Sequence, residues 1–445
     1  MACNASKSPL LRIISKRGYS AQASPKAAGR GNEIQTTTLP NKLVVATADS
    51  NLPVSRVSVV FRAGSRHESY DNLGIAHTLR VAAGLTTKRS TAFAITRNIQ
   101  QIGGSLTATG DRETIAYTVQ VTSDHLETGI RFLQDVATAP AFKPWELSDS
   151  VTRIRVDCAS IPDDVRAVEL LHKAAFRSGL GNSLFCPSHN IGRLSSEALQ
   201  HYFASNCTTN RCAVVGVGVE HRLLAGFAQN FDLESGAGKD VASKYYGGAE
   251  HRKDKSGRLA HVAIAGEGGS AANLKEALTF AVLQCAAGAG PSTYRGNVNG
   301  TIGKAVTSAL GSEVFSFSAL NASYSDSGLF GFALSTDAKN IGKGVEAGVK
   351  ALKSANVSAE DVNRGKAQLK AAILHQHGTD GGLLCDMATQ AALLGGAHGA
   401  SELIAVVDTI SQADVQAAAR RAGSSKLSMG AVGNLGHVPH VTDLV

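Results

Sequence analysis

The feature that most constrains the fold of this chain is a set of elements that occurs twice. Each copy begins with two short segments in which apolar and polar residues alternate around a turn, a pattern that predicts an antiparallel strand pair. Each copy continues with two helical segments separated by a break. The strands, turn and helices fall at residues 104–109, 111–113, 114–121, 124–137 and 145–155 in the first copy, and at 315–320, 325–328, 329–334, 337–353 and 359–375 in the second.

The two copies also share the residues that begin their first helices and the strands that close the halves. Thr122-Ser123-Asp124 and Ser335-Thr336-Asp337 stand at equivalent places, and their side chains suit the free N–H groups at a helix start. The apolar residues 212–218 have a counterpart at 427–433. Because the period is near the size of a domain, the repeat indicates two similar halves rather than a solenoid. We expect an α+β fold in which each half is a mostly antiparallel sheet with helices packed on one face.

The domain boundaries follow from the repeat and from the segments around it. The chain is long enough for two domains of about 200 residues, each able to bury a substantial core. Residues 20–38 form a polar lead, and the first predicted strand follows a turn within residues 39–46. Residues 236–257 are rich in Gly, Lys and charge, which is typical of a linker. We therefore predict an N-terminal domain over residues 39–235 and a C-terminal domain over residues 258–445.

Residues 1–19 have the composition of a mitochondrial presequence. They contain Lys7, Arg12, Lys16 and Arg17 but no acidic residue, and their apolar residues can share one face of a helix opposite the basic ones. The residues around Ser20 resemble a site of presequence cleavage. A basic tail without a targeting function is the alternative. These four basic residues supply half of the formal net charge of +8. No basic face with interleaved aromatic residues remains, so nucleic acid is not expected as a partner.

The composition also argues against several other classes of protein. No apolar run is long enough to span a membrane as a helix. The cysteines include no C-x-x-C pair, so we expect reduced thiols rather than a zinc knuckle, a thioredoxin-type motif or a disulfide scaffold. The spacings of a haem-attachment motif and of iron–sulfur ligands are also missing, and no redox cofactor is predicted. The cysteines are Cys3, Cys158, Cys186, Cys207, Cys212, Cys285 and Cys385.

Residues 71–82 carry the frame of a zinc-binding helix without the residues that hold zinc. In an H-x-x-E-H helix the two His ligate the metal from one face, and the Glu between them activates a metal-bound water. Here His77 stands at the first ligand position, Arg80 replaces the Glu and Val81 replaces the second His, while Asn72 is a candidate N-cap. An Arg cation repels a dication and Val has no lone pair. The helix therefore predicts no metal and no hydrolytic activity.

Several of these segments together resemble a known family. The segment 74–79, the loop 184–192, the strand–turn–strand units and the duplication resemble the pitrilysin-type inverted zinc proteases and their mitochondrial relatives. Residues 321–332 and the ending 433–437 are especially similar to the core subunits of mitochondrial ubiquinol–cytochrome c reductase, respiratory complex III. The resemblance covers essentially the whole chain after the predicted presequence.

The resemblance implies two similar halves and a bowl-shaped dimer with core protein 1, peripheral to the inner membrane on its matrix side. Cytochrome b, cytochrome c1 and the Rieske protein are further implied partners, and the implied role is structural rather than redox. The family's remaining zinc ligand, a Glu on a later helix, falls near Asp157, whose side chain is shorter. The degenerate motif is thus His77, Arg80, Val81 and Asp157, and it implies no catalytic residue, no metal and no cofactor.

A noncatalytic, presequence-binding subunit of a mitochondrial processing peptidase is the alternative. In such relatives a Gly-rich loop in the region of residues 288–304 helps to grip presequences, and the cavity between the halves could then hold such a peptide. A flexible loop at the rim of the cavity or at the subunit interface is the other interpretation of this stretch. Here Tyr294 and Arg295 interrupt the Gly-rich stretch. Together with residues 321–332 and 433–437, this interruption favours the assembly subunit.

Other motifs imitate functional sites. Residues 266–271 fit the G-x-G-x-x-A form of a dinucleotide fingerprint, but the acid expected about twenty residues later is missing, so we predict a tight strand-to-helix turn. Residues 288–304 lack the spacing of a phosphate loop, and Ala305 stands where a Ser or Thr would bind magnesium. The close His pairs, predicted to be features of a helix end and of the tail, are His375 with His377 and His437 with His440.

Overall fold

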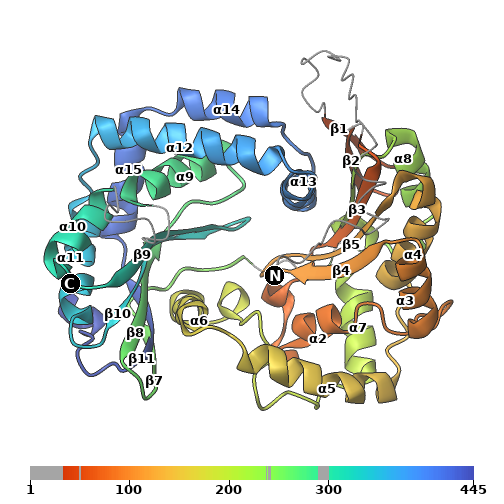
Figure 1. Ribbon diagram of the computed structural model, residues 1–445, viewed down its shortest axis with the longest axis horizontal. Coiled ribbons are helices and arrows are strands. Elements are labelled where there is room, and N and C mark those ends of the chain that lie inside the picture. Colours follow the sequence, from red (N-terminus) through yellow and green to blue (C-terminus); the bar gives the residue numbers. More distant parts are fainter. Residues whose placement is uncertain (1–33, 50–51, 237, 239–241, 289–299, 445) are drawn as a thin grey trace, which may run out of the picture. The chain divides into compact units, whose positions relative to one another are not determined.

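Two β-sheets, one from each half of the chain, organise the computed structural model (Figure 1). The structure describes residues 34–49, 52–236, 238, 242–288 and 300–444, and residues 34–445 form a single compact unit. The predicted presequence, residues 1–19, and most of the Gly-rich stretch 288–304 lie outside the described residues.

The first sheet has six strands in the order β1-β2-β6-β3-β5-β4, and the second has five in the order β7-β11-β8-β10-β9. Within these sheets only the pairs β2–β6 and β7–β11 are parallel. The strands are β1 Ile34–Thr38, β2 Val44–Ala48, β3 Val54–Phe61, β4 Ser105–Gly110, β5 Ile115–Thr122, β6 Cys212–Val217, β7 Glu250–Asp254, β8 Leu259–Glu267, β9 Phe315–Ser323, β10 Gly328–Asp337 and β11 Ser428–Gly433. Apart from β1, the two sheets match in strand order and direction, which confirms the duplication.

The helices follow the same repeat, and the four predicted from the sequence correspond to α4, α5, α11 and α12. In the first half the helices are α2 Ile75–Val81, α3 Ala92–Gln101, α4 Leu126–Thr138, α5 Pro144–Ala159, α6 Asp163–Phe176, α7 Ser196–Asn206 and α8 His221–Gln229. In the second half they are α9 Leu274–Gly288, α10 Thr301–Leu310, α11 Ile341–Ser354, α12 Ala359–His377, α13 Asp380–Leu394, α14 Ala400–Thr409 and α15 Gln412–Ser424. Short 3-10 turns, such as η1 Ser65–His67 and η2 Tyr70–Asn72, connect several of these elements.

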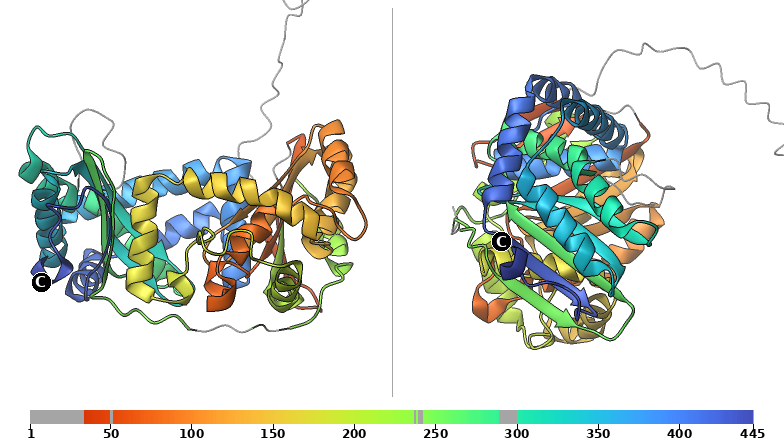
Figure 2. Two further views of the ribbon diagram at one scale, coloured as in Figure 1. Left: turned by 90° about the horizontal axis from the view of Figure 1, so that it is seen from below. Right: turned by 90° about the vertical axis from the view of Figure 1, so that its left-hand side faces the viewer.

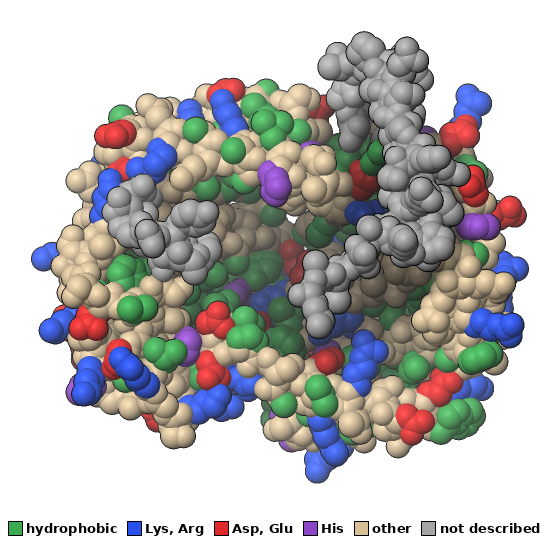
Figure 3. Space-filling model, in the orientation of Figure 1, with side chains coloured by type: hydrophobic (Ala, Val, Ile, Leu, Met, Phe, Trp, Pro, Cys, Tyr) green, Lys and Arg blue, Asp and Glu red, His purple; other side chains and the backbone are tan. Residues whose placement is uncertain are grey.

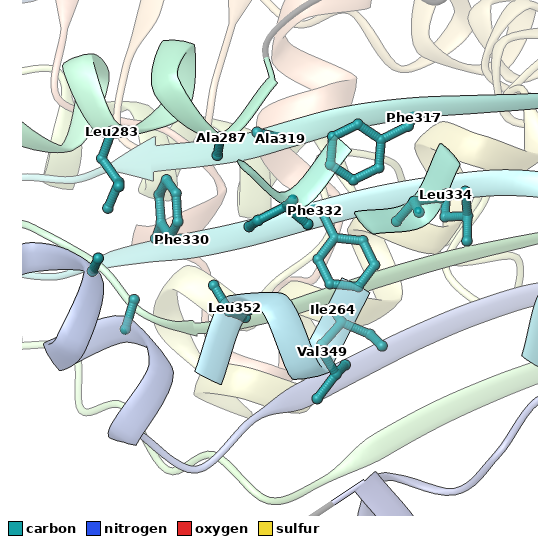
Figure 4. Packing of buried hydrophobic residues seen from close by; sticks show 14 of the residues in the cluster. Ile264, Leu283, Ala287, Phe317, Ala319, Phe330, Phe332, Leu334, Val349 and Leu352 are labelled. Atoms are coloured by element: carbon teal, nitrogen blue, oxygen red, sulfur yellow. The ribbon is translucent and has the colours of Figure 1, made fainter. Parts of the chain in front are cut away.

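Each half has its own hydrophobic core between its sheet and its helices. In the second half the rings of Phe317 and Phe332 stack with their centroids 5.9 Å apart. Figure 4 shows these rings among the side chains of Leu283, Val349 and Leu352 from α9 and α11. A separate cluster forms the core of the first half around β3, β5, α4 and α7. The predicted α+β fold with two similar halves is therefore confirmed.

The second face of each sheet is covered by a helix from the other half. Helix α6 packs through Leu171 and Phe176 against β8, β10 and β11 of the second sheet. Figure 2 shows the yellow ribbon of α6 beside the strands of this sheet. Helix α13 packs through Leu383 and Met387 against β2, β3 and β6 of the first sheet. The prediction that helices cover one face of each sheet was therefore incomplete, since both faces are covered. In agreement with this, every residue of β6 and of β11 is buried. Strands that are apolar on both sides require a second layer.

Two strands lie inside segments that the sequence predicted to be a polar lead and a linker. Strand β1 lies inside the predicted polar lead 20–38 and pairs antiparallel with β2. Strand β7 lies inside the predicted linker 236–257 and pairs with β11. Both are edge strands made of polar residues, and an edge strand needs only backbone hydrogen bonds and tolerates charged side chains. Hydrophobic patterns therefore do not reveal them.

The equivalent turns of the two repeats meet each other. Glu113, in the turn between β4 and β5, accepts hydrogen bonds from the Ser325 hydroxyl at 2.6 Å and from the Ser325 backbone N–H at 3.0 Å. Arg66 donates to Glu113 at 2.6 Å and to Asp326 at 2.9 Å. A cavity of about 250 Å³ lies beside this contact. The duplication thus supplies both partners of a polar link between the halves.

A second link between the halves depends on pH. His172 of α6 donates from Nδ1 to the Val168 carbonyl and accepts at Nε2 from the Tyr324 hydroxyl, each at 2.8 Å. Burial, together with the nearby Arg112, lowers the pKa of His172 from 6.5 to about 3. The unfolded chain therefore binds a proton more readily than the folded chain between these values. The stabilisation by neutral His172 is complete above pH 6.5 and is lost as the pH falls towards 3.

We expect His172→Phe to weaken this pH dependence. The wild-type chain should lose about 1.4 kcal/mol of unfolding free energy for each pH unit below 6.5 because of this residue. The variant is less stable at neutral pH, because Tyr324 and the Val168 carbonyl lose a partner, but it lacks this acid-dependent loss. Urea unfolding between pH 7.5 and 4.5 measures both curves. Parallel curves for the two proteins would contradict the assignment.

Candidate functional site

The predicted zinc-type helix is α2, and a buried carboxylate holds its start. Gly74 adopts a left-handed conformation with φ of 90°, and a Cβ at this position would lie 2.6 Å from the Cys186 sulfur. Glu68 accepts hydrogen bonds from the backbone N–H groups of Gly74 and Ala76 at 2.8 and 2.9 Å. Burial raises the pKa of Glu68 to about 7, although these two hydrogen bonds oppose the shift.

The prediction that Asn72 caps α2 is wrong. Asn72 ends the preceding 3-10 turn η2, where its side-chain oxygen accepts from the Ser69 backbone N–H at 2.7 Å. Glu68 takes the capping role from six residues before Gly74, a distance at which a local capping pattern cannot be recognised.

His77 is buried and held in one orientation. Its Nδ1 accepts a hydrogen bond from the Cys186 backbone N–H at 3.1 Å, which places the proton of the neutral ring on Nε2. The Phe185 ring meets it edge-on, with ring centroids 5.8 Å apart. Burial and the nearby Arg80 lower the pKa of His77 to about 4. His77 is therefore neutral at physiological pH, as a metal ligand would have to be.

The structure brings Asp157 of α5 next to His77, as the resemblance implied. The distance from His77 Nε2 to Asp157 Oδ2 is 3.6 Å, too long for a hydrogen bond. The Asp157 side chain keeps 41% of its surface exposed, whereas that of His77 is fully covered. Two residues of the degenerate motif that are eighty positions apart in the chain thus lie side by side.

The other two positions of the motif do not suit a metal. Val81 is buried in an apolar cluster with Ile154 and Cys186, so its side chain fills space instead of ligating. Arg80 is half-buried, and burial lowers its pKa, yet a guanidinium stays charged at neutral pH. In the described part of the chain, no three His, Cys, Asp or Glu side chains gather in a way that could hold a metal ion. The residues present therefore do not fit a zinc site, and that no residue here is catalytic stays a prediction.

The close His pairs lie at a helix end and in the tail after β11, as predicted. His377 ends α12 and pairs with Asp386 at 2.7 Å, and His440 in the tail pairs with Glu250 at 2.5 Å. Among the described residues, no helix has both the length and the apolar character to cross a membrane. On the face that Figure 3 shows, basic and acidic side chains are interspersed.

Comparison with known proteins places these features in a family. The model of the insulinase family (peptidase family M16) matches residues 43–188, and the model of the peptidase M16 inactive domain matches residues 193–369. The mouse protein cytochrome b-c1 complex subunit 2, mitochondrial, is 38% identical over 98% of this chain and 100% of its own length. The human protein of the same name is 37% identical over 96% of this chain and 98% of its own length.

A second group of relatives is more distant. The Arabidopsis thaliana protein described as probable mitochondrial-processing peptidase subunit alpha-1 is 28% identical over 92% of this chain and 83% of its own length. Both M16 models together cover most of the duplicated region. The chain therefore belongs to peptidase family M16 and, within it, to the group that contains mitochondrial cytochrome b-c1 complex subunit 2.

Proposed function

We propose that this chain is a non-catalytic core subunit of mitochondrial respiratory complex III. The observation that carries the proposal is the 38% identity to mouse cytochrome b-c1 complex subunit 2 along the full length of that protein. In this role the chain contributes to the assembly and stability of the complex that transfers electrons from ubiquinol to cytochrome c.

The chemistry of α2 supports a structural role. Hydrolysis by an inverted zinc site needs two His ligands, a third carboxylate ligand and a Glu that takes a proton from the bound water. This chain retains His77 and places Asp157 nearby, while Arg80 and Val81 remove the proton acceptor and the second ligand. Two separate requirements of the reaction are therefore lost.

The position in the complex is a finer proposal. We place the chain on the matrix side, peripheral to the inner membrane and paired with core protein 1, in contact with the subunits that carry cytochrome b, cytochrome c1 and the Rieske centre. The predicted presequence over residues 1–19 supports import into the mitochondrion. The links between the halves support a rigid platform, because buried helices and paired turns both connect the two sheets.

Purification from mitochondria tests the proposal. After mild detergent extraction we expect the native chain to comigrate with b-type and c-type haem absorbance and with core protein 1. Recovery as a soluble matrix heterodimer that cleaves presequences would contradict it. That outcome would favour the alternative, a presequence-binding subunit of a processing peptidase, for which the 28% identity to the Arabidopsis protein is the supporting observation.

A double substitution tests the loss of catalysis. We expect Arg80→Glu with Val81→His to bind no stoichiometric zinc and to cleave no basic peptide. A His at position 81 would have to leave the apolar cluster with Ile154 and Cys186, and the Asp157 side chain is shorter than the Glu of active relatives. Metal analysis after dialysis and an EDTA-controlled peptidase assay provide the measurement. One zinc per chain together with EDTA-sensitive cleavage would show that the site needs only these two residues.

A further inference from the structure

A cavity of about 440 Å³ lies in the N-terminal half, away from the degenerate motif. It is lined by residues before and at the start of α5, by α7 and by the segment that follows α8, and by no residue of α2. Its volume falls in the range of small-molecule sites, about 300–1,000 Å³. The aromatic rings of Phe142 and Phe203 line it, packed edge to face with their centroids 6.1 Å apart.

The cavity is lined by charges of both signs, each sign from its own part of the chain. Lys88 and Lys143 come from two segments joined by a β-bridge and by a 2.8 Å hydrogen bond from Lys88 N–H to the Ala139 carbonyl. Asp232 and Glu234 come from the segment after α8. Among the described residues, none of these four side chains forms an ion pair or a hydrogen bond. The ammonium of Lys143 lies 5.7 Å from the centroid of the exposed Trp145 ring.

The backbone at Phe142 is held in an unfavourable conformation. Its φ of 48° lies in the left-handed region, which a bulky side chain seldom adopts. The Ser196 hydroxyl donates to the Phe142 carbonyl at 2.6 Å, and the ring is 5% exposed. Strained backbone of this kind persists only where its surroundings fix it, and it is found at ligand sites. Here the strain sets an aromatic ring into the wall of the cavity.

These features restrict the chemical class of ligand that the cavity can bind. A simple anion would be attracted by the lysines and repelled by Asp232 and Glu234, and the reverse holds for a simple cation. An uncharged apolar molecule would make no use of the four charges, of which Lys88, Asp232 and Glu234 belong to exposed residues. A molecule with an ammonium group, a carboxylate and a ring between them satisfies both pairs of charges and packs against the two phenylalanines.

We propose that the cavity between Phe142, Phe203, the two lysines and the two acids binds a small aromatic zwitterion. The carboxylate lies on Lys88 and Lys143, the ammonium lies on Asp232 and Glu234, and the ring packs against Phe142 and Phe203. This site is independent of the proposed role in complex III, because it uses neither the degenerate motif nor the links between the halves.

The test compares three probes on the purified full-length chain. The probes are 4-(aminomethyl)benzoate, which carries both charges, benzylamine, which carries only the ammonium, and 4-methylbenzoate, which carries only the carboxylate. Titration calorimetry and saturation-transfer NMR measure binding. We expect the zwitterion to bind about two- to fivefold more tightly than either singly charged probe, since an ion pair with a solvent-exposed side chain contributes about that factor.

Variants then assign the charges. Lys143→Met should weaken binding of the zwitterion about two- to fivefold and leave binding of benzylamine unchanged or tighter. Asp232→Asn should weaken binding of the zwitterion by a similar factor and leave binding of 4-methylbenzoate unchanged or tighter. Glu234→Gln serves as a second acidic variant if Asp232→Asn folds poorly, as judged by circular dichroism. Lys350→Met, on α11 and outside this cavity, is the matched control and should bind like the wild type. Equal affinities for the three probes, no binding of the zwitterion, or an unchanged zwitterion affinity in the cavity variants would overturn the proposal.

Discussion

Gly430→Ala is expected to reduce the unfolding free energy by about 3 kcal/mol, near the upper end of overpacking effects. Gly430 lies on β11, directly beneath α6 of the other half. A Cβ there would overlap the carbonyl oxygen of Ala167 and the backbone nitrogen of Leu171. The atoms in the way belong to a helix backbone, so no side-chain rotation can relieve the clash. Thermal and urea unfolding of the purified chain measure the loss.

Gly226→Ala is the matched control for this prediction. Gly226 lies within α8, and nothing lies within 4 Å of a Cβ built there. In a helix interior the same substitution favours folding by about 0.5–1 kcal/mol. A neutral or stabilising Gly226→Ala beside a strongly destabilising Gly430→Ala assigns the loss to the contact between α6 and the second sheet. Similar effects of the two variants would contradict that contact.

The contact between α6 and the second sheet was not predictable from the sequence, and helix α6 itself was not predicted, although strands β10 and β11 of that sheet were. The alternation at residues 104–121 and 315–334 predicts strands, because a strand pair with one buried face requires a period of two. The helices that follow each strand pair were likewise predicted from the pattern of residues along the chain. No local sequence pattern shows that a helix of one half covers the sheet of the other half. The apolar face of α6, with Leu171 and Phe176, would suit either sheet equally well.

The candidate site also combines features that the sequence predicts with features that it does not. The motif itself is contiguous, so the replacement of the catalytic Glu by Arg80 and of the second His ligand by Val81 is visible in the sequence. The nearness of His77 and Asp157 came from the resemblance, and the structure places their side chains 3.6 Å apart. The capping role of Glu68 and the hydrogen bond from Cys186 to His77 depend on loops that fold back onto α2. Such contacts are set by tertiary structure and not by spacing along the chain.

The polar residues of the first repeat's turn show how the duplication acts in the folded protein. Arg112 and Glu113 are neighbours in a short turn that the sequence marks only as polar. Glu113 reaches the equivalent turn of the second repeat at Ser325, while Arg112 turns the other way, towards α6. Since α6 in turn covers the second sheet, both side chains connect the first sheet to elements that hold the other half. A duplicated fold that serves as a platform for partners needs such links, because its two cores are otherwise separate.

Arg112→Met is expected to destabilise the chain by about 3–5 kcal/mol, the usual cost of removing one partner of a buried ion pair. The Arg112 side chain is 4% exposed and pairs with Glu169 of α6, which is 11% exposed, and it also donates to the carbonyls of Leu180 and Asn182. Methionine fills a similar volume but leaves the carboxylate without its cation, with the Ser183 hydroxyl and the Leu184 backbone N–H as its remaining donors, and both carbonyls lose the guanidinium. Arg258→Met is the control, because the Arg258 side chain is 85% exposed although it also pairs with an acid, Asp337. Urea unfolding should show a clear loss for Arg112→Met and none for Arg258→Met, since only the first substitution removes a buried cation from a largely buried carboxylate. Equal stability of the two variants would mean that Glu169 is already hydrated and that the turn contributes little to joining the halves.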